Sequence, residues 1–296
     1  MLFRPIGIED KEVYEKAFAK HSGKGCEFSF ANLILWGERL IAFCDDHIVW
    51  RSLFDGRWYY TLLLGESDKS RVIEEVIKDA QDLGIELVFI GVYENEKSVL
   101  QQLYPGRFDY TFSRGSFDYV YSIDDLADLS GKKYHRKRNH ISQFQKACPE
   151  YRVCEITPDL LPQVEQMAEI WYEKRREDTP DVDFEAEKTA LHRAVSNYTA
   201  LDMDGLVLMC GDRIIAFTMA SPMSADTLDV HFEKAVSDIN GGYAAINFEF
   251  ARYLRLKYPH IRFLDREEDM GIEGLRKAKE SYYPHHLIEK YRAQMK

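Results

Sequence analysis

The sequence predicts an α/β protein made of two tandem domains, each with a mixed sheet covered by helices on both faces. The chain has 296 residues, which suffices for two domains of about 150 residues that each bury a core. Its composition, 45% hydrophobic and 30% charged, is typical of globular proteins. The strongest indication is an order of elements, β-β-β-α-β-α-β after a helical segment, that occurs once in each half without repeated residue identities.

The first domain is expected to span residues 1–150. A helical segment precedes three strands, and apolar residues then recur at helical spacing from Val72 to Ala80. Strands are expected at 39–46, 47–54, 58–65, 85–92 and 116–122, and helices at 9–18, 68–84 and 95–105. Antiparallel strands that lead into a strand–helix–strand crossover predict a mixed sheet.

The second domain is expected to span residues 151–296 and to carry the active cleft. Its strands are expected as a hairpin within 205–221 and at 227–235, 261–267 and 286–294, and its helices at 158–177, 243–258 and 272–283. The first domain is expected to be degenerate and to end in a basic helix at 132–147. Its crossover stretch "LLLGESDKSRVIEE" contains one glycine and no polar pair comparable to His231 and Glu233.

Charge and cysteine usage limit the class of protein. The formal net charge of −11 argues against broad binding to nucleic acids or anionic membranes, because the averaged field repels phosphates. Five cysteines, an odd number without any CxxC pair, predict neither a disulfide framework nor a structural zinc site but reduced thiols. No signal peptide is evident, and no apolar run approaches the length of a membrane span. The chain is therefore expected to be cytoplasmic, without a transmembrane segment.

The first stretch that could carry chemistry is a basic segment at 130–146. It contains six Lys or Arg and two His, with no acid among them. In a helix that starts near Tyr134, Lys133, Lys137 and His140 fall on one side, while Phe144 and its apolar neighbour Ile141 anchor the helix. Such a helix can clamp a phosphate, since arginine offers forked donors and lysine a point charge. The alternative is a solvated face that pairs with acids elsewhere.

The second stretch is "HFEKAVSDINGGYAAINFEF". Side chains two apart share a strand face, so His231 and Glu233 are expected to point the same way, and Glu233 is a candidate general base. The alternative is a surface carboxylate paired with Lys234 or Arg252. The glycines before the following helix allow backbone N–H groups to approach an anionic ligand, although such glycines are often turn chemistry alone. The expected contacts are Asn240, Gly241, Gly242 and Tyr243 for a cofactor and Asn247 for substrate.

The third stretch, residues 263–284, collects acids where a strand ends and a helix begins. Asp265 alternates with apolar positions and is expected to face inward, where it needs a partner, whereas Arg266 is expected to point the opposite way. Glu267, Glu268 and Asp269 could hold a cation or an amine, or could cap the helix. The chain contains no HExxH, no Cys/His metal spacing and no GxSxG, so no metal is expected.

The motifs "GKKYHRKRNHISQFQK" and "FLDREEDMGIEGLRKAKESYYP" resemble a bacterial family related to the C-terminal domain of phosphatidylglycerol lysyltransferase, and more distantly the Fem-type transferases. The resemblance covers nearly the whole chain. It implies two tandem GNAT-like (acyl-CoA N-acyltransferase) folds, in which an aminoacyl group passes from an aminoacyl-tRNA ester to an amine or hydroxyl. The family's basic "K/R-R-N" helix corresponds to Lys137, Arg138 and Asn139, which would face a phosphate-bearing substrate. A coenzyme A signature is not evident, the nearest stretch being "SDINGGYA".

The expected function is that of an acyltransferase or aminoacyltransferase. Glu233 is the expected base, followed by His231 and Asp265, while Glu267, Glu268 and Asp269 would receive a cationic group and Lys133, Lys137 and Arg138 a phosphate. The expected partners are a phosphate-bearing small molecule or lipid precursor and charged tRNA, not DNA. Aminoacyl-tRNA or acyl-CoA would be a co-substrate, without a tightly bound cofactor. The alternatives are an acyl-CoA-dependent N-acetyltransferase and a non-catalytic sensor module.

Overall fold

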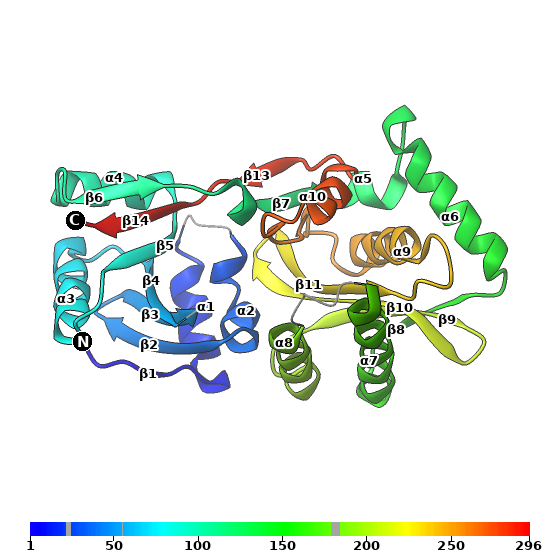
Figure 1. Cartoon of the computed structure of the whole chain (residues 1–296), viewed down its shortest axis with the longest axis horizontal. Helices are drawn as coiled ribbons and strands as arrows, with labels where there is room; N and C mark the ends of the chain where they lie inside the picture. Colours follow the sequence, from blue (N-terminus) through cyan, green and yellow to red (C-terminus); the bar gives the residue numbers. More distant parts are fainter. Residues whose placement is uncertain (22–24, 55, 179–183) are drawn as a thin grey trace. The chain divides into compact units, whose positions relative to one another are not determined.

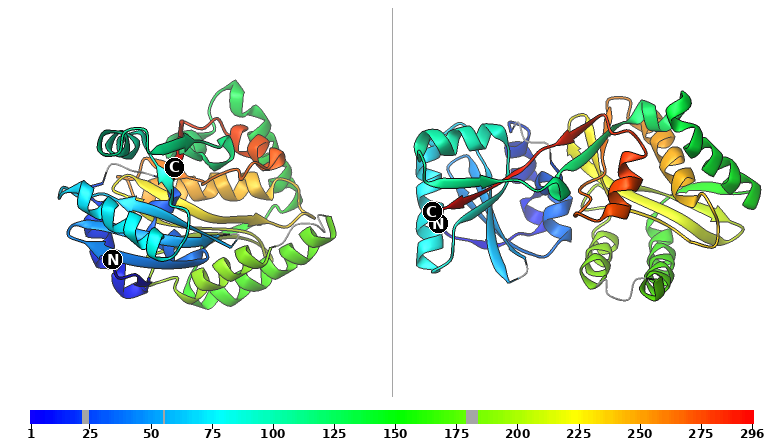
Figure 2. Two further views of the ribbon diagram at one scale, coloured as in Figure 1. Left: turned by 60° about the vertical axis from the view of Figure 1, so that its left-hand side comes forward. Right: turned by 45° about the horizontal axis from the view of Figure 1, so that its top comes forward.

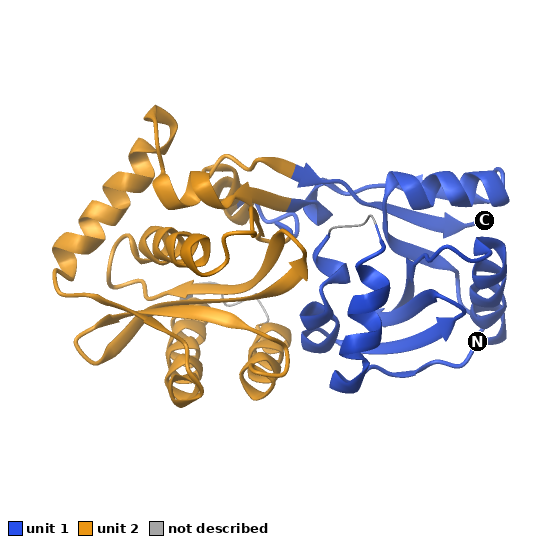
Figure 3. Ribbon diagram, turned by 180° about the vertical axis from the view of Figure 1, so that it is seen from behind, with its two compact units in different colours: residues 1–118, 268–273, 287–296 blue, residues 119–267, 274–286 orange. Residues whose placement is uncertain are grey.

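The computed structural model describes residues 1–21, 25–54, 56–178 and 184–296. The chain forms two compact units (Figure 3). Unit 1 consists of Met1–Asp118, Glu268–Glu273 and Leu287–Lys296, and unit 2 of Tyr119–Glu267 and Gly274–His286. Each unit contains one seven-stranded sheet. The predicted α/β class with mixed sheets is confirmed.

The sheet of unit 1 has the order β1-β2-β3-β4-β5-β14-β6. Its strands are β1 (Arg4–Pro5), β2 (Glu38–Cys44), β3 (His47–Phe54), β4 (Arg57–Leu63), β5 (Val88–Val92), β6 (Phe108–Thr111) and β14 (Tyr291–Met295). Neighbouring strands are antiparallel except for the parallel pair β4–β5. The helices are α1 (Lys11–Phe18), α2 (Phe30–Leu35), α3 (Lys69–Asp82) and α4 (Glu94–Leu103).

Helix α3 shows how periodicity places an element in unit 1. Asp68 caps its N-terminus and accepts a hydrogen bond from the Ser70 N–H at 2.9 Å. Its buried residues Val72, Ile73 and Val76 recur on one face and pack in the core of the sheet. This is the apolar stripe that the sequence predicts.

The sheet of unit 2 has the order β13-β7-β12-β11-β10-β9-β8. Its strands are β7 (Asp118–Ser122), β8 (Arg152–Glu155), β9 (Asp204–Cys210), β10 (Arg213–Ser224), β11 (Thr227–Ala235), β12 (Phe263–Asp265) and β13 (His286–Ile288). The helices are α5 (Ile123–Asp128), α6 (His135–Ala147), α7 (Leu161–Asp178), α8 (Glu185–Ser196), α9 (Gly242–Lys257) and α10 (Glu273–Glu280). Helices α7 and α8 lie on one face of the sheet and α9 on the other, with α5 and α6 packed against α9 (Figures 1 and 2).

The two halves exchange their closing strands. The strand predicted at 116–122 is β7, which pairs with β12 in the second sheet, whereas β14 lies between β5 and β6 in the first sheet. The units therefore divide differently from the expected boundary near residue 150, and the basic segment belongs to unit 2. A local sequence pattern locates a strand but does not identify the strand with which it pairs. The sequence therefore placed the domain boundary near residue 150 and not after Asp118.

The expectation of reduced thiols is wrong for two of the five cysteines. Cys148, which follows the last residue of α6, forms a disulfide with Cys210, the last residue of β9. Their Cα atoms are 6.1 Å apart, within the usual range for a disulfide. The two residues are 62 positions apart in the sequence, and spacing alone could not reveal that the fold brings these two element ends together.

Candidate functional site

In unit 2, strand β11 separates from strand β12 partway along its length. The parallel ladder covers the register pairs Thr227↔Phe263, Leu228↔Leu264 and Asp229↔Asp265, and β11 then continues to Ala235. A β-bulge interrupts the pairing of β11 with β10 in this stretch, because Met219 pairs with Phe232 but Ala220 with Val230. Beyond Asp229, β11 therefore continues without β12 as its ladder partner.

Glu233 lies on this diverging part of β11 and forms a buried ion pair. Arg266 donates from Nη2 to its Oε1 at 2.7 Å, and Asn247 on α9 donates from Nδ2 to its Oε2 at 3.1 Å. The side chains of Glu233 and Arg266 are only 10% and 13% exposed. Neither partner considered from the sequence is used, since Lys234 pairs with Glu187 and Arg252 with Glu249. The carboxylate of Glu233 thus has both oxygens engaged.

Two tyrosines and a lysine lie beside this ion pair. The Arg266 guanidinium lies 5.4 Å from the ring centroid of Tyr121 and 4.9 Å from that of Tyr282. The Nζ atom of Lys137 lies 3.4 Å from the same Tyr282 centroid. Burial lowers the pKa of the Lys137 ammonium to about 8, with Arg266 adding to the shift and Glu233 opposing it. We call Glu233, Arg266, Asn247, Lys137 and Tyr282 the Glu233 cluster.

The other predicted residues of the basic segment have structural partners. Lys133 pairs with Asp125 at 3.4 Å. Arg138 donates to the main-chain carbonyls of Leu129 and Gly131, at 2.8 Å for the latter, just after α5 ends. Asn139 contacts the ring of His135, one helical turn earlier, at 3.2 Å. Of the predicted phosphate-binding residues, Lys137 is the one that the fold brings to Glu233.

His231 belongs to a second buried group. Its ring contacts Ser221 Oγ at 2.8 Å, Glu267 Oε1 at 3.3 Å and Asp229 Oδ2 at 3.6 Å. Asp265 is fully buried and accepts a hydrogen bond from the Glu267 N–H at 2.8 Å. The expectation that His231 and Glu233 share a strand face did not allow for the bulge, and their contacts lie in separate networks. His231, Asp265 and Glu267 are thus brought together, apart from the partners of Glu233.

Glu268 and Asp269 lie in unit 1, where cations of the chain itself contact them. Lys290 donates to Glu268 at 3.1 Å and to Asp118 at 2.8 Å, and it pairs with Glu27 at 2.6 Å. Burial raises the pKa of the Glu268 carboxyl to about 7, with Asp118 and Glu27 adding to the shift and Lys290 opposing it. Asp269 is fully buried and lies 3.6 Å from the Arg114 guanidinium.

The predicted cofactor residues surround the start of α9. Gly241 adopts φ +88°, and a Cβ there would lie 2.1 Å from the His140 carbonyl oxygen, so α6 packs directly against this turn. Asn240 is exposed and Gly242 is buried as the first helical residue. The Tyr243 hydroxyl accepts a hydrogen bond from Trp171 Nε1 at 2.9 Å. The glycine turn therefore has a packing role, whatever it binds.

A cavity of about 320 Å³ adjoins this turn and the end of β11. Its lining includes Tyr243 but none of Asn240, Gly241 and Gly242, and it adds Trp171 and the cations Lys174, Arg175 and Arg213. Arg213 pairs with Asp238 at 2.8 Å and Lys174 with Glu177 at 2.7 Å. The mixture of aromatic rings and cations is suited to a phosphate-bearing ligand.

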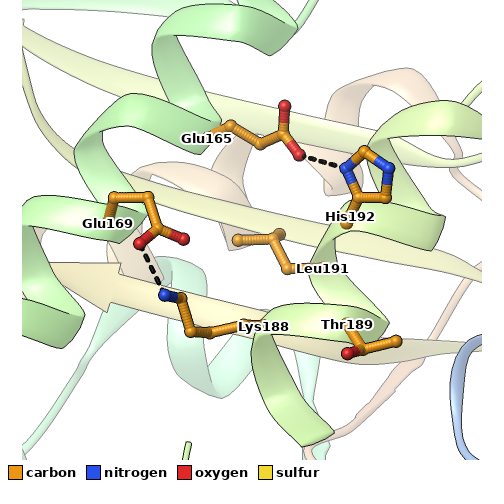
Figure 4. Close-up of a pocket in the computed structure, with 6 residues that line it drawn as sticks. All are labelled: Glu165, Glu169, Lys188, Thr189, Leu191 and His192. Atoms are coloured by element: carbon orange, nitrogen blue, oxygen red, sulfur yellow. Dashed lines mark hydrogen bonds and ion pairs between the residues drawn. The ribbon is translucent and has the colours of Figure 1, made fainter. Parts of the chain in front are cut away.

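A second cavity, of about 310 Å³, lies between α7 and α8 (Figure 4). Glu165 contacts His192 at 2.8 Å and Lys188 contacts Glu169 at 2.7 Å; dashed lines mark both interactions in Figure 4. None of its lining residues was predicted from the sequence. Its charged groups are paired with one another.

Sequence reasoning missed several residues of these groups. It set Arg266 aside because strand alternation pointed it away from Asp265, and that same alternation carries it to Glu233. It did not consider Tyr282, whose only sequence signal is the pair of tyrosines after α10, or Lys290.

Within the described ranges, Cys26–Glu27–Asp118 and Asp229–His231–Glu267 have ligand atoms close enough to hold a metal ion. Lys290 already occupies the first group.

Over the described residues, no helix combines the length and the apolar character that crossing a membrane requires.

The sequence matches the family described as phosphatidylglycerol lysyltransferase, C-terminal, over residues 18–294. An uncharacterised protein of Mycoplasmoides gallisepticum is 25% identical over 181 residues, which are 60% of this chain and 55% of that protein. The chain thus spans about half the length of this curated relative.

Solved structures show the same architecture. A conserved protein of unknown function from Bacteroides thetaiotaomicron is 35% identical, with a TM-score of 0.92 and 99% of both chains covered. L-PGS from Bacillus licheniformis is 14% identical, with a TM-score of 0.70 and coverage of 97% and 92%.

More distant folds agree. FemX has a TM-score of 0.64 at 11% identity, covering 100% of this chain and 98% of that one. A tandem GNAT protein of the clavulanic acid pathway has a TM-score of 0.53 at 10% identity, covering 99% and 98%. These likenesses confirm the predicted tandem GNAT-like fold. With the match over residues 18–294, the chain belongs to the family of the phosphatidylglycerol lysyltransferase C-terminal domain.

Proposed function

We propose that this chain is an aminoacyltransferase that moves an aminoacyl group from an aminoacyl-tRNA ester to an amine or hydroxyl of a phosphate-bearing acceptor. The observation that carries the proposal is the departure of β11 from β12 after Asp229, with the Glu233 cluster on the diverging stretch. Acyl transfer needs donor and acceptor held together, a base for the acceptor's proton and hydrogen-bond donors for the oxyanion. Membership of a family named for lysyl transfer supports the same reaction class.

The donor's phosphates would bind in the cavity at the start of α9. Lys174, Arg175 and Arg213 line it, and the N-terminus of a 16-residue helix adds a positive dipole end. Trp171 and Tyr243 offer aromatic faces against which a base of the donor can stack. This placement leads from the cavity, along the end of β11, to Glu233.

The acceptor's phosphate would meet the exposed basic face at the start of α6. Lys132, Lys133 and Arg136 are exposed there, and no acid interrupts the segment 130–146. Such a local patch attracts one anionic group although the chain as a whole carries a net charge of −11. A phospholipid head group or a phosphorylated cell-wall precursor fits this chemistry.

A thermal-shift comparison tests the donor. A ligand that binds only the native state raises stability, by about 2.7 kcal/mol at one hundred times its Kd. We expect aminoacyl-tRNA to raise the Tm more than the same tRNA without its aminoacyl group. No shift with charged tRNA, at concentrations that saturate other tRNA-binding proteins, would exclude this donor.

An acyl-CoA-dependent N-acetyltransferase is the second candidate. It is favoured by the position of the cavity at the N-terminus of α9, which suits a pyrophosphate as well as a tRNA end. Stabilisation by acetyl-CoA but not by charged tRNA would select it. Stabilisation by a phosphorylated metabolite, without turnover of either donor, would select the sensor module instead.

A further inference from the structure

The side chain of Lys137 forms no ion pair with a carboxylate among the described residues, and it lies beside a second cation, Arg266. Its Nζ lies 3.4 Å from the centroid of the Tyr282 ring, and Arg266 lies 4.9 Å from the same centroid. Glu233 neutralises Arg266 at 2.7 Å. Among the described residues no acid forms an ion pair with Lys137. Two positive groups therefore share one ring and one carboxylate.

Three contacts seat helix α6, which carries Lys137. The Tyr134 hydroxyl, at the start of α6, donates to the Tyr282 carbonyl at 3.0 Å. The next turn is fixed by Arg138, which donates to Gly131 at 2.8 Å. Further along, the His140 carbonyl packs against Gly241. These contacts seat the backbone of α6 beside Tyr282, and loss of a proton from Lys137 relieves the repulsion between its ammonium group and Arg266.

Glu233 is poorly suited to accept a proton while the cluster is intact. One of its oxygens accepts from Arg266 and the other from Asn247, so both acceptor positions facing the cluster are in use. Protonating this carboxylate would also leave the Arg266 guanidinium, 13% exposed, without its counter-charge. A base is then required from elsewhere in the same group.

We propose that the ε-amine of Lys137 is the proton acceptor for acyl transfer at the Glu233 cluster, an inference that rests on the proposed function. The acceptor's oxygen or nitrogen forms a bond to the carbonyl carbon of the donor ester, and its proton passes to the lone pair of Lys137 Nζ. The bond between that carbon and the ester oxygen breaks. The proton then passes from Lys137 to this oxygen, so the donor leaves as an alcohol and Lys137 is neutral again.

The pKa of about 8 supports this role. At pH 7 about a tenth of such amines are neutral, against about four in ten thousand for an ordinary lysine with a pKa of about 10.4, a gain of roughly 200-fold. A base is most effective when its pKa lies near the working pH. Lys137 therefore combines position, restraint and a usable fraction of the neutral form.

Two substitutions separate a base from an anion-binding lysine. Lys137→Arg keeps the positive charge but cannot release a proton, and Lys137→Met removes both properties. For a base, we expect both variants to lower kcat by about 100-fold or more while KM changes less than about twofold. The wild-type kcat/KM should rise with pH around 8, and this limb should vanish in both variants. Lys146→Arg, exposed on the same helix, is the matched control.

The result that overturns the inference is an Lys137→Arg variant with near wild-type kcat, because the positive charge alone would then suffice for activity.

A second measurement does not require turnover of a substrate. The rate at which sulfo-N-hydroxysuccinimide acetate acetylates Lys137 in the intact wild-type chain is followed by mass spectrometry from about pH 6 to pH 10. It should have a midpoint near 8, below the value of about 10.4 that is typical of a lysine side chain. An ordinary midpoint for Lys137 overturns the inference as well. If no donor is turned over, the proposed function and the base role both fail, and the labelling still reports whether the amine is unusual.

Discussion

Glu233 is held by an ion pair in which both partners are largely buried, and this makes its role testable without an activity assay. Glu233→Gln keeps a contact for Asn247 but removes the charge opposite Arg266. Breaking a buried pair costs about 3 kcal/mol or more, because the remaining charge stays buried. We therefore expect a loss of that order in the free energy of unfolding, measured by guanidinium titration.

The control for this change is Glu12→Gln, which breaks an exposed pair with Lys16 at 2.5 Å. Water and salt screen the charges of an exposed pair, so little loss is expected there. Equal losses in the two variants would contradict the buried-pair account. An unchanged stability in Glu233→Gln would return Glu233 to the role of a free base that the sequence suggested.

The raised pKa of Glu268 predicts that the stability of unit 1 depends on pH. The pKa of its carboxyl is raised from 4.5 to about 7, so the folded chain retains a proton that the unfolded chain releases between these values. This contribution to stability is fully present below about pH 4.5 and is lost as the pH rises through about 7. Glu268→Gln, which resembles the protonated form, should flatten the slope of unfolding free energy against pH in this window. A slope equal to that of the wild type would contradict the assignment.

At the scale of elements, α6 is joined to the sheet by the Cys148–Cys210 disulfide. Closing a loop of 62 residues restricts the unfolded chain by about 4 kcal/mol at room temperature. Cys148→Ser, or a strong reductant, should lower the unfolding free energy by an amount of this order. Cys154→Ser, at a partly buried thiol outside the disulfide, should change it much less. A wild-type chain whose stability is the same with and without reductant would contradict this linkage.

The turn before α9 gives a second test of how α6 is seated. Gly241→Ala adds a Cβ at φ +88° that would lie 2.1 Å from the His140 carbonyl, so α6 must move. Gly211→Ala also has a positive φ, +61°, but nothing lies within 4 Å of the added atom. We expect Gly241→Ala to lose clearly more stability than Gly211→Ala in thermal unfolding. Equal shifts in Tm would mean that α6 is not fixed at this turn.

The strands and helices were predictable where a local pattern fixes them. Helix α3 follows from the spacing of Val72, Ile73 and Val76, and the β9–β10 hairpin from the Gly-Asp turn. The exchange of β7 and β14 between the sheets was not predictable, because strand pairing joins residues that lie far apart in the sequence. The same limit hid the contacts of Arg266 and Lys290, whose partners lie 33 and 172 positions away.

On the scale of the whole molecule, the fold and the family agree with the reading of the sequence. The tandem GNAT-like architecture matches L-PGS and FemX at TM-scores of 0.70 and 0.64. The basic segment, in a chain of net charge −11, packs on the same unit as the diverging strands β11 and β12. The seventeen residues 130–146 thus contribute one lysine to the Glu233 cluster and present further cations on the surface.

The most direct test of the central proposal is a transfer assay on the full chain. Radiolabelled lysyl-tRNA is mixed with vesicles that contain phosphatidylglycerol, and lipid-soluble label is followed over time in wild type and in Lys137→Met. The account predicts label in the lipid fraction with the wild type and a rate lower by about 100-fold with the variant. Equal rates in the two proteins would contradict the account. It would also be contradicted if the protein transferred an acetyl group from acetyl-CoA but accepted no aminoacyl-tRNA as donor, whatever the amino acid.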